Sequence, residues 1–599
     1  TPHLPTVTYA ILVAYSVPLE LYDALYAYLQ ARADTITATS HPVEEASHAQ
    51  RERRRFEFSR PFLGGDTVVT QLHDWIFFRM AKYVASPNIY PGWSISLVQS
   101  SGFGKSRLLR ELANTTKQGP NGQMKVLYMC LRPDSMAHTA YPEATVHLRD
   151  HFFPPVELSH GDEGSTILEQ ELTEKLLQLI DYAVCHWDSI GDEWFSLFDN
   201  QADAAICQRI QNHIVKPDDS EWPEEPREYR ALVLAIDDAR SLFRTSEWDA
   251  TGWYPRLCRV IKKVSLPREC AGGEIYSVCA ILVDSSSAIT GEDTTPLPFS
   301  TGLRQHDPSV GLPRSDRHPL FPPFVLTHSM DIRFEELIQN AKRRGLSSLH
   351  FYQELVGSGE KDAWASLVCM GRPLWDRVKH DDWKTKEEPT KVIQLAANKL
   401  VSGLPAEKQE TFTDEASLDG VASILCRLGL RAHSWSPLAC QSVADYMAVL
   451  EYMSFSPSER LLSTYSSDPV LTFGAARFCK LLDQGVIDTG DASGGELVSR
   501  ILLLLVMDAT GVVVSSSPQV LERRQYAGAF HCVERFLSTL YGNSPLLVRD
   551  QHQRDVTSLN ALHVNAKLTG WRDWRIGFSH FVPLMEMPDE ETLWALLSR

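Results

Sequence analysis

The 599-residue sequence has few of the residue patterns that mark several common protein classes. Its 11 cysteines are scattered, with no Cys-x-x-Cys pair and an odd total, so neither a zinc-finger spacing nor a complete disulfide framework is indicated. No His-Glu-x-x-His motif of the zinc-protease type is present. We therefore expect reduced thiols in an intracellular protein, located in the cytoplasm or nucleus of its own cell or of a host cell.

Positive charge is scarce relative to negative charge. Lys and Arg total 58 against 76 Asp and Glu, which gives a net charge of −18. A chain-wide nucleic-acid-binding surface would normally be basic, so the composition argues against one but leaves a local basic groove open. The most apolar stretch, residues 497–507, is too short to cross a bilayer and is followed by Asp508. We therefore expect no membrane partner.

The sequence does contain a glycine-bearing turn between a short apolar run and a helical pattern. Residues 95–98 read I-S-L-V and form a short, mainly apolar run. Residues 99–104 read Q-S-S-G-F-G, and Lys105 and Ser106 precede leucines at helical spacing. This order is typical of a phosphate-binding loop, in which backbone amides and the helix start face phosphate oxygens. The full motif has glycine where Gln99 stands, so the match is partial. A surface Gly-Lys-Ser turn is the alternative.

We predict that this loop and the helix that follows it contact a nucleotide. Lys105 would lie on the outer phosphates and Ser106 would ligate Mg²⁺. The predicted contact residues are Ser101, Gly102, Phe103, Gly104, Lys105, Ser106 and Arg107.

A second apolar run, residues 231–236, ends in Asp237 and Asp238. Open α/β sheets place ligand sites at the carboxyl ends of their strands. We predict that Asp237 binds Mg²⁺ opposite Ser106, and that Asp238 activates the attacking water. The alternative is an ordinary strand that runs into an aspartate helix cap. A third run, residues 275–283, ends in polar residues 284–287, which either sense the γ-phosphate or begin a solvent loop.

These patterns predict a phosphate-loop NTPase core of the α/β class, a parallel sheet flanked by helices, followed by a mainly α-helical lid and C-terminal region. We divide the chain into an N-terminal helical or linker region (1–60), the α/β domain (61–332), a helical lid or winged-helix-like region (333–484) and a C-terminal α/β region (485–599). The last region is expected to be incomplete. One of the helices predicted in the lid region spans residues 441–453.

The motifs resemble those of additional-strand phosphate-loop NTPases close to the AAA+ and STAND ATPases. Several short sequence stretches also resemble those of fungal crinkler-related proteins. The matching stretches include Q-S-S-G-F-G-K-S-R (99–107), Y-M-C-L-R-P (128–133), L-A-I-D-D-A-R-S-L (234–242) and G-R-P-L-W (371–375). The resemblance implies ATP and Mg²⁺ as ligands and places Arg372 and Pro373 in a lid element that approaches the nucleotide. ATP is preferred to GTP because no Asn-Lys-x-Asp motif is present. Arg107, Arg304 and Arg372 are candidate electrophiles.

We therefore expect an ATP-dependent switch that also engages a protein partner or a second copy of itself. Hydrolysis is expected to be slow, because the family pattern ends Asp-Glu and Asp238 is shorter by one methylene. One alternative is a nucleotide-binding or degenerate scaffold for protein–protein interaction. Another is the NTPase part of a crinkler-type nuclease effector. Glu496 resembles a nuclease glutamate, but the companion Asp and Gln/Glu-x-Lys motif is not found before Arg599.

Overall fold

The computed structural model describes most of residues 58–286, with its main gaps at 117–123, 134–141, 156–161, 200–202, 215–227, 244–251 and 270–273. It also describes residues 321–326 and shorter runs between 338 and 581. The predictions for residues 1–57, for Arg304 and for the Glu496 side chain lie outside the described residues.

The chain divides into two compact units. The sheet unit contains Pro42–Ile332 together with Leu450–Leu462, and the helical unit contains Arg333–Val449 and Ser463–Arg599. The segment Leu450–Leu462 therefore belongs to the sheet unit although its flanking residues do not.

The sheet unit is built on five parallel strands. These are β1 (Ser94–Val98), β2 (Met124–Cys130), β3 (Glu228–Asp237), β5 (Glu274–Asp284) and β6 (Phe324–Val325), in the spatial order β2-β3-β5-β1-β6. A short strand, β4 (Arg268–Glu269), pairs antiparallel with β5. The continuous apolar runs of the sequence form the buried strands, as expected where both faces of a parallel sheet are covered.

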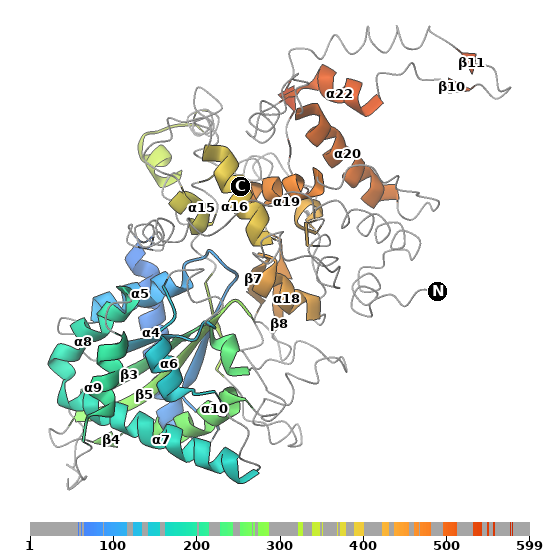
Figure 1. Cartoon of the computed structure of the whole chain (residues 1–599). Coiled ribbons are helices and arrows are strands. Elements are labelled where there is room, and N and C mark those ends of the chain that lie inside the picture. The colour runs from blue at the N-terminus through green and yellow to red at the C-terminus, as the bar shows by residue number, and fades with distance from the viewer. Residues whose placement is uncertain are drawn as a thin grey trace. The chain divides into compact units, whose positions relative to one another are not determined.

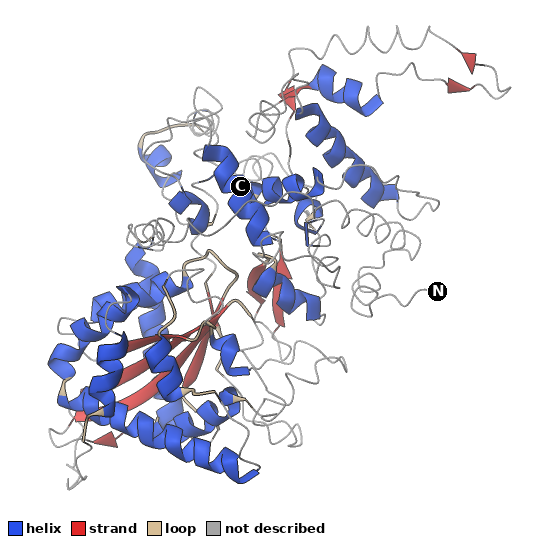
Figure 2. Cartoon of the chain, viewed as in Figure 1, coloured by secondary structure: helices blue, strands red, loops and turns tan. Residues whose placement is uncertain are grey.

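Helices flank this sheet, which Figure 2 shows as the central layer of the unit. They are α4 (Gly65–Ala85), α5 (Lys105–Thr116), α6 (Val146–Phe152), α7 (Asp162–Cys185), α8 (Trp187–Phe195), α9 (Asp203–Gln211) and α10 (Trp253–Val264), labelled in Figure 1, with short 3-10 turns η3 (Ser196–Asp199) and η4 (Ala239–Phe243). The expectation of an α/β core with a parallel sheet flanked by helices is confirmed. Among the described residues, no helix combines the length and the apolar character needed to cross a membrane.

The helical unit contains α15 (Pro373–Val378), α16 (Glu388–Leu400), α18 (Pro437–Asp445), α19 (Pro469–Lys480), α20 (Gly495–Gly511) and α22 (Val533–Tyr541). Helix α16 packs on α19, and α20 packs on α22 around Val506, Met507 and Phe536. Two short strand pairs, β9 (His531–Cys532) with β12 (Arg575–Ile576) and β10 (Val548–Arg549) with β11 (Asp555–Val556), accompany them.

The helix predicted over residues 441–453 is wrong in its second half. Helix α18 ends at Asp445, and Met447 takes a left-handed backbone conformation with φ of 63°. The chain then forms β7 (Val449–Met453), which pairs with β8 (Arg460–Thr464). A short apolar run fits a buried helix and a buried strand equally well, so periodicity alone could not separate the two.

Candidate phosphate-binding site

The turn between β1 and α5 has the backbone of a glycine-dependent loop. Gly102 and Gly104 have φ angles of 90° and 91°, a region that residues with a Cβ rarely occupy. The amide of Leu108 donates to the carbonyl of Gly104 at 2.8 Å, so the helical hydrogen bonds begin directly after the turn. The first amides of α5 therefore face the turn without intrahelical acceptors, which is the general basis of anion binding at helix starts.

The Lys105 ammonium lies against the mouth of the loop. Its Nζ donates to the carbonyl of Gln99 at 2.6 Å and to that of Ser100 at 3.2 Å. Desolvation lowers the pKa of Lys105 to about 8, although the charges of Asp237 and Asp284 oppose this shift. A phosphate at this position would restore the favourable surroundings of the ammonium, because it would add negative charge within contact distance.

Ser106 and Asp237 meet across the carboxyl edge of the sheet. The Ser106 hydroxyl donates to Asp237 Oδ2 at 2.5 Å, although β5 lies between the strands that precede these two residues. Tyr128, on β2, donates to the same carboxylate oxygen at 2.8 Å. The backbone amide of Asp238 donates to the other oxygen of Asp237 at 3.0 Å. The Asp237 carboxylate is thus held in one orientation from three directions.

The electrostatics of Asp237 favour a cation at this position. Desolvation raises the pKa of this 5% exposed carboxyl, and the charge of Asp238 raises it further. Hydrogen bonds from Ser106 and Tyr128 lower the pKa only in part. A bound divalent ion would stabilise both carboxylates, and a serine hydroxyl with an aspartate is a donor set that suits Mg²⁺. The residues present therefore fit the predicted metal.

Asp238 has different surroundings from its neighbour. Its backbone lies in the left-handed region with φ of 55°, which aspartate tolerates better than most residues. Its Oδ2 accepts from Arg132 Nε at 2.8 Å, and Arg132 also donates to the carbonyl of Pro142 at 2.7 Å. The candidate base is therefore ion-paired with an arginine that follows β2 and is also held by the Pro142 carbonyl.

The end of β5 contributes a third acidic group. Asp284 is 2% exposed and accepts from Arg240, through its amide at 2.6 Å and its Nε at 2.8 Å. Arg240 also binds the Ser285 hydroxyl, and Ser286 donates its amide to Asp284 at 2.9 Å. Arg240 lies in η4, two residues after Asp238. This network therefore joins the carboxyl ends of β3 and β5.

Gln99 connects the loop to the β7–β8 segment. Its Nε2 donates to the carbonyl of Leu450 at 3.0 Å, and its Oε1 accepts from the amide of Leu450 at 2.8 Å. The same oxygen accepts from the Ser100 amide at 2.9 Å. Gln99 is fully buried, and its primary amide pairs with Leu450 as a neighbouring strand would. Gln99, which stands where the full motif has glycine, thus links Ser100 of the loop to Leu450. We call this set of hydrogen bonds the Gln99 clamp.

The other predicted contact residues are placed as follows. Ser101, Gly102 and Gly104 are partly exposed in the turn, whereas Phe103 is 1% exposed and packs in the core. Arg107 is buried and pairs with Glu111 on its own helix, with Nη2 and Oε1 2.6 Å apart. The loop, Lys105, Ser106, Asp237 and Asp238 are thus brought together.

Arg372 and Pro373 belong to the helical unit. Arg372 is 1% exposed, and its Nε donates to Asp468 Oδ2 at 2.9 Å while Nη2 binds the Met447 carbonyl. Trp375 donates its indole N–H to the same Asp468. Pro373 is buried and begins α15, a position where proline is favoured because no backbone amide is needed there. The surroundings of Arg372 are those of a buried ion pair.

Sequence reasoning did not assign Tyr128, Arg132 or Arg240 to the site. All three lie within the stretches that carry the family resemblance, at or just after the carboxyl ends of β2 and β3. Their position at the strand ends was a usable signal, because parallel strands deliver such side chains to one edge of the sheet.

Comparison with known proteins adds one family match. A family model described as a domain of unknown function (DUF8735) matches residues 66–268, from the start of α4 to the start of β4. No curated protein and no solved structure matches the chain. The matched segment contains the loop, Lys105, Ser106 and both aspartates, so the chain is similar to this family over the part that carries most of the site.

Proposed function

We propose that the protein is an ATP-binding, Mg²⁺-dependent NTPase that works as a nucleotide-dependent switch. The contact between Ser106 and Asp237 is the observation that carries the proposal. It joins the start of a helix after a glycine turn to an acidic strand end, beside the Lys105 ammonium. Together these groups supply a phosphate cradle, a cation for the outer phosphates and two metal ligands.

The strand order supports the same proposal. In the order β2-β3-β5-β1-β6, one strand separates the loop strand β1 from the acidic strand β3. This is the arrangement expected of additional-strand NTPases, which the sequence resembles. From β1 the chain continues to β2, which lies at one edge of the sheet. The later strand β6 pairs with β1 on its opposite side. Such a reversal leaves a crevice for a ligand at the carboxyl edge.

When bound, Mg²⁺ would neutralise charge on the β- and γ-phosphates and orient the terminal phosphate. Ser106 and Asp237 would hold it, Asp237 directly or through water. Lys105 would bind the outer phosphates, and the amides at the start of α5 would fix their orientation. Arg240 lies close enough to Lys105 to affect its pKa, which makes Arg240 a further candidate cation for the phosphates.

The ion pair of Asp238 with Arg132 favours slow turnover. A general base must reach the proton it removes, usually within about 3 Å, and the rate contribution of proton transfer is about 10²- to 10⁴-fold. With Oδ2 held by Arg132 at 2.8 Å, Asp238 must leave this partner or act through its other oxygen. This observation favours the second candidate function, a nucleotide-held scaffold that hydrolyses little ATP.

The Gln99 clamp provides a route by which a nucleotide-dependent change in the loop would be transmitted to Leu450. Nucleotide binding to the loop would act on Gln99, which holds Leu450 through both backbone groups. The chain continues from Leu450 and from Leu462 into segments of the helical unit. A change in the loop would therefore reach the polypeptide that leads into the second unit.

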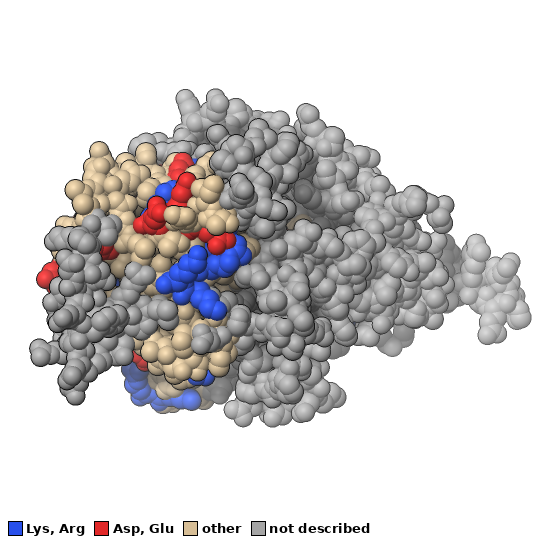
Figure 3. Space-filling model, turned by 90° about the horizontal axis from the view of Figure 1, so that it is seen from below, with Lys and Arg blue, Asp and Glu red and all other residues tan. Residues whose placement is uncertain are grey.

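The surface charge gives little support to a nucleic-acid partner. On the described surface seen in Figure 3, Lys and Arg form small separate groups with Asp and Glu nearby, and no continuous basic track is visible there. An extended basic groove would be needed to follow a phosphate backbone.

A titration with Mg-ATP tests the proposal. The full chain should bind ATP, and Lys105→Ala should weaken binding about 10- to 100-fold, because a charge-assisted hydrogen bond contributes about 1.5–3 kcal/mol. Lys82→Ala is the matched control, since Lys82 is exposed on α4. Asp237→Asn should remove the Mg²⁺ dependence of binding. Absence of ATP binding by the unmodified chain overturns the proposal.

Phosphate release separates the switch from the scaffold. A switch requires measurable turnover that falls in Asp238→Ala. Binding without turnover, unchanged by Asp238→Glu, would favour the scaffold. Competition with GTP tests the preference for adenine.

A further inference from the structure

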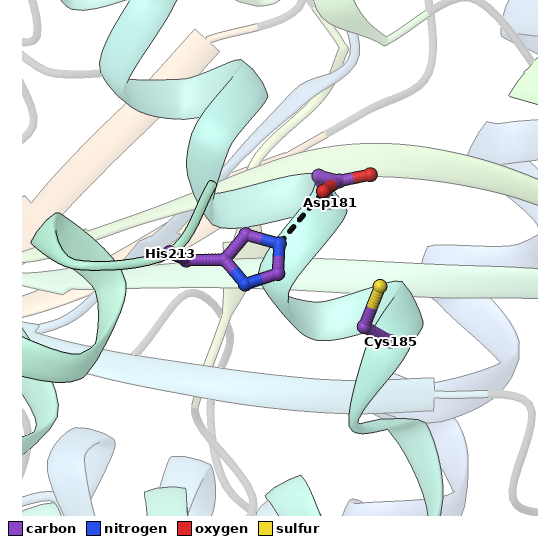
Figure 4. A group of neighbouring side chains, drawn as sticks. All are labelled: Asp181, Cys185 and His213. Atoms are coloured by element: carbon purple, nitrogen blue, oxygen red, sulfur yellow. Dashed lines mark hydrogen bonds and ion pairs between the residues drawn. The ribbon is translucent and has the colours of Figure 1, made fainter. Parts of the chain in front are cut away.

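Three metal-binding residue types meet near the end of α7, on residues that the proposed NTPase chemistry does not use. Asp181 and Cys185 are four residues apart on this helix and therefore lie on the same face. His213 follows the end of α9. One ligand atom from each of the three lies within 4.8 Å of the other two, and Figure 4 shows Asp181 and His213 pointing toward each other with Cys185 one turn along the helix.

The position of His213 is fixed from α7. Gln178, one turn before Asp181, donates its side-chain amide to the carbonyl of Gln211 at 3.1 Å and to that of His213 at 2.7 Å. The His213 ring packs against buried Tyr182, with 5.5 Å between the ring centroids. The approach of His213 to α7 is thus held through both its backbone and its side chain.

The donor atoms suit a borderline divalent ion. A carboxylate oxygen, an imidazole nitrogen and a thiolate sulfur are ligands of Zn²⁺, with bond lengths of about 2.0–2.3 Å in tetrahedral sites. Such bonds place the ligand atoms about 3.3–3.8 Å from one another. His213 Nε2 and Asp181 Oδ2 are 2.7 Å apart and would open slightly, whereas the thiol would move inward by about 1 Å. Rotation of the exposed Cys185 side chain can provide that shift.

An ordinary surface ion pair between histidine and aspartate explains part of this arrangement. The thiol is the feature that such a pair does not require. His186 lies close by, with its ring stacked on Tyr182 and its centroid 6.0 Å from that of His213. His186 is not part of the three-residue group, because its Nδ1 is bonded to the Tyr182 carbonyl at 2.9 Å, so a water molecule would complete four ligands.

We propose that Asp181, Cys185 and His213 form a binding site for a zinc-class divalent ion that ties the end of α9 to α7. Binding converts the Cys185 thiol to a thiolate and releases its proton to solvent, while neutral His213 coordinates through nitrogen. The site joins two helices that flank the sheet, so its first effect is on the stability of this layer.

Cobalt is the probe of choice, because thiolate coordination to Co²⁺ gives a charge-transfer band in the near ultraviolet. The reduced, metal-free full chain should bind one Co²⁺ with this band, and Zn²⁺ should displace it. Cys185→Ser should abolish the band, and His213→Gln should weaken binding at least about a hundredfold, because even the outer partners of metal ligands contribute about 10- to 100-fold. Zn²⁺ should also raise the unfolding temperature of the unmodified chain but not of Cys185→Ser.

His73→Gln is the matched control. His73 forms a similar pair with Asp74 at 3.3 Å and is not part of the three-residue group. Its replacement should leave the band and the affinity unchanged. A cobalt band that persists in Cys185→Ser, or a reduced chain that binds no Co²⁺, would overturn the proposal.

Discussion

Asp237 and Asp238 are adjacent residues of the same type, but their side chains make different contacts. The Asp237 carboxylate points to the buried edge of the sheet and accepts from Ser106 and Tyr128. Asp238 follows the strand with a positive φ, and its side chain pairs with Arg132 instead. The backbone turn at the strand end, rather than the residue type, therefore places one carboxylate at the proposed metal site and the other in an ion pair.

His151 gives a pH-dependent prediction at the same scale. Its ring, on α6, accepts a hydrogen bond at Nδ1 from Gln211 Nε2 at 3.1 Å, while Nε2 is buried without a hydrogen-bond partner among the described atoms. Desolvation, followed by the charge of Lys175, lowers the pKa of His151 to about 4. The ordinary pKa is about 6.5, so between these values the unfolded chain binds a proton that the folded chain does not.

Stability from the neutral His151 ring should therefore be lost as the pH falls from about 6.5 to about 4. Between pH 7 and pH 5, we expect the unfolding temperature of His151→Gln to fall less than that of the unmodified chain. Thermal unfolding across this range measures the difference, and an NMR titration of the histidine rings locates it. A His151 ring that titrates near pH 6.5 would contradict the prediction.

At the scale of elements, the Gln99 clamp holds the β7–β8 segment to the candidate phosphate loop. Gln99→Ala removes three hydrogen bonds and leaves buried backbone groups of Ser100 and Leu450 without these partners. Each buried polar group left unsatisfied costs about 1–3 kcal/mol, so we expect a loss of at least about 2 kcal/mol in the free energy of unfolding. Urea denaturation measures the loss.

Hydrogen exchange adds a local readout, because the Leu450 amide should exchange faster in Gln99→Ala. Gln170→Ala is the control, since Gln170 is exposed and donates its side-chain amide to Glu174, one turn along the same helix, at 3.2 Å. Unchanged protection at Leu450 would show that the clamp contributes little.

Helices α16 and α19 give a second prediction at this scale. A Cβ placed on Gly474 would lie 2.7 Å from the Ala397 amide nitrogen and 2.9 Å from the carbonyl carbon of Ala396. Both neighbours are backbone atoms, so Gly474→Ala must push the helices apart. Overpacking costs about 1–3 kcal/mol, which exceeds the gain of about 1 kcal/mol in helix propensity. We expect a lower unfolding temperature by calorimetry, and an unchanged or raised one would contradict this packing.

At the scale of the whole molecule, the buried ion pair of the helical unit gives a prediction for Arg372. Its side chain pairs with Asp468, and both residues belong to the helical unit. We expect Arg372→Met to cost about 3–5 kcal/mol because it leaves a buried carboxylate without its cation. Asp468→Asn should also destabilise the unit, and both variants should retain ATP affinity.

Hydrogen exchange can assign the loss of stability to peptides from residues 372–476. An ATP titration measures the affinity of each variant. If Arg372→Met weakens ATP binding more than tenfold while Asp468→Asn does not, Arg372 contacts the nucleotide as the resemblance to STAND proteins implies. Equal behaviour of the two variants supports a structural ion pair.

The buried strands and the position of the glycine turn could be predicted from local sequence patterns. Continuous apolar runs become buried parallel strands, and the positive φ of Gly102 and Gly104 restricts the turn to glycine, so both features are encoded locally. The same reasoning selected Lys105, Ser106 and Asp237, which the structure brings close together.

The contacts between residues distant in the sequence could not be predicted in this way. The place of β5 between β1 and β3, the pairing of Asp238 with Arg132 and the hold of Gln99 on Leu450 all join residues far apart in the chain. Residues 449–453 form β7 because β8 pairs with this strand, although their apolar run also suits a helix. Periodicity reports the local environment of a residue, whereas these features depend on long-range pairing that no local pattern encodes.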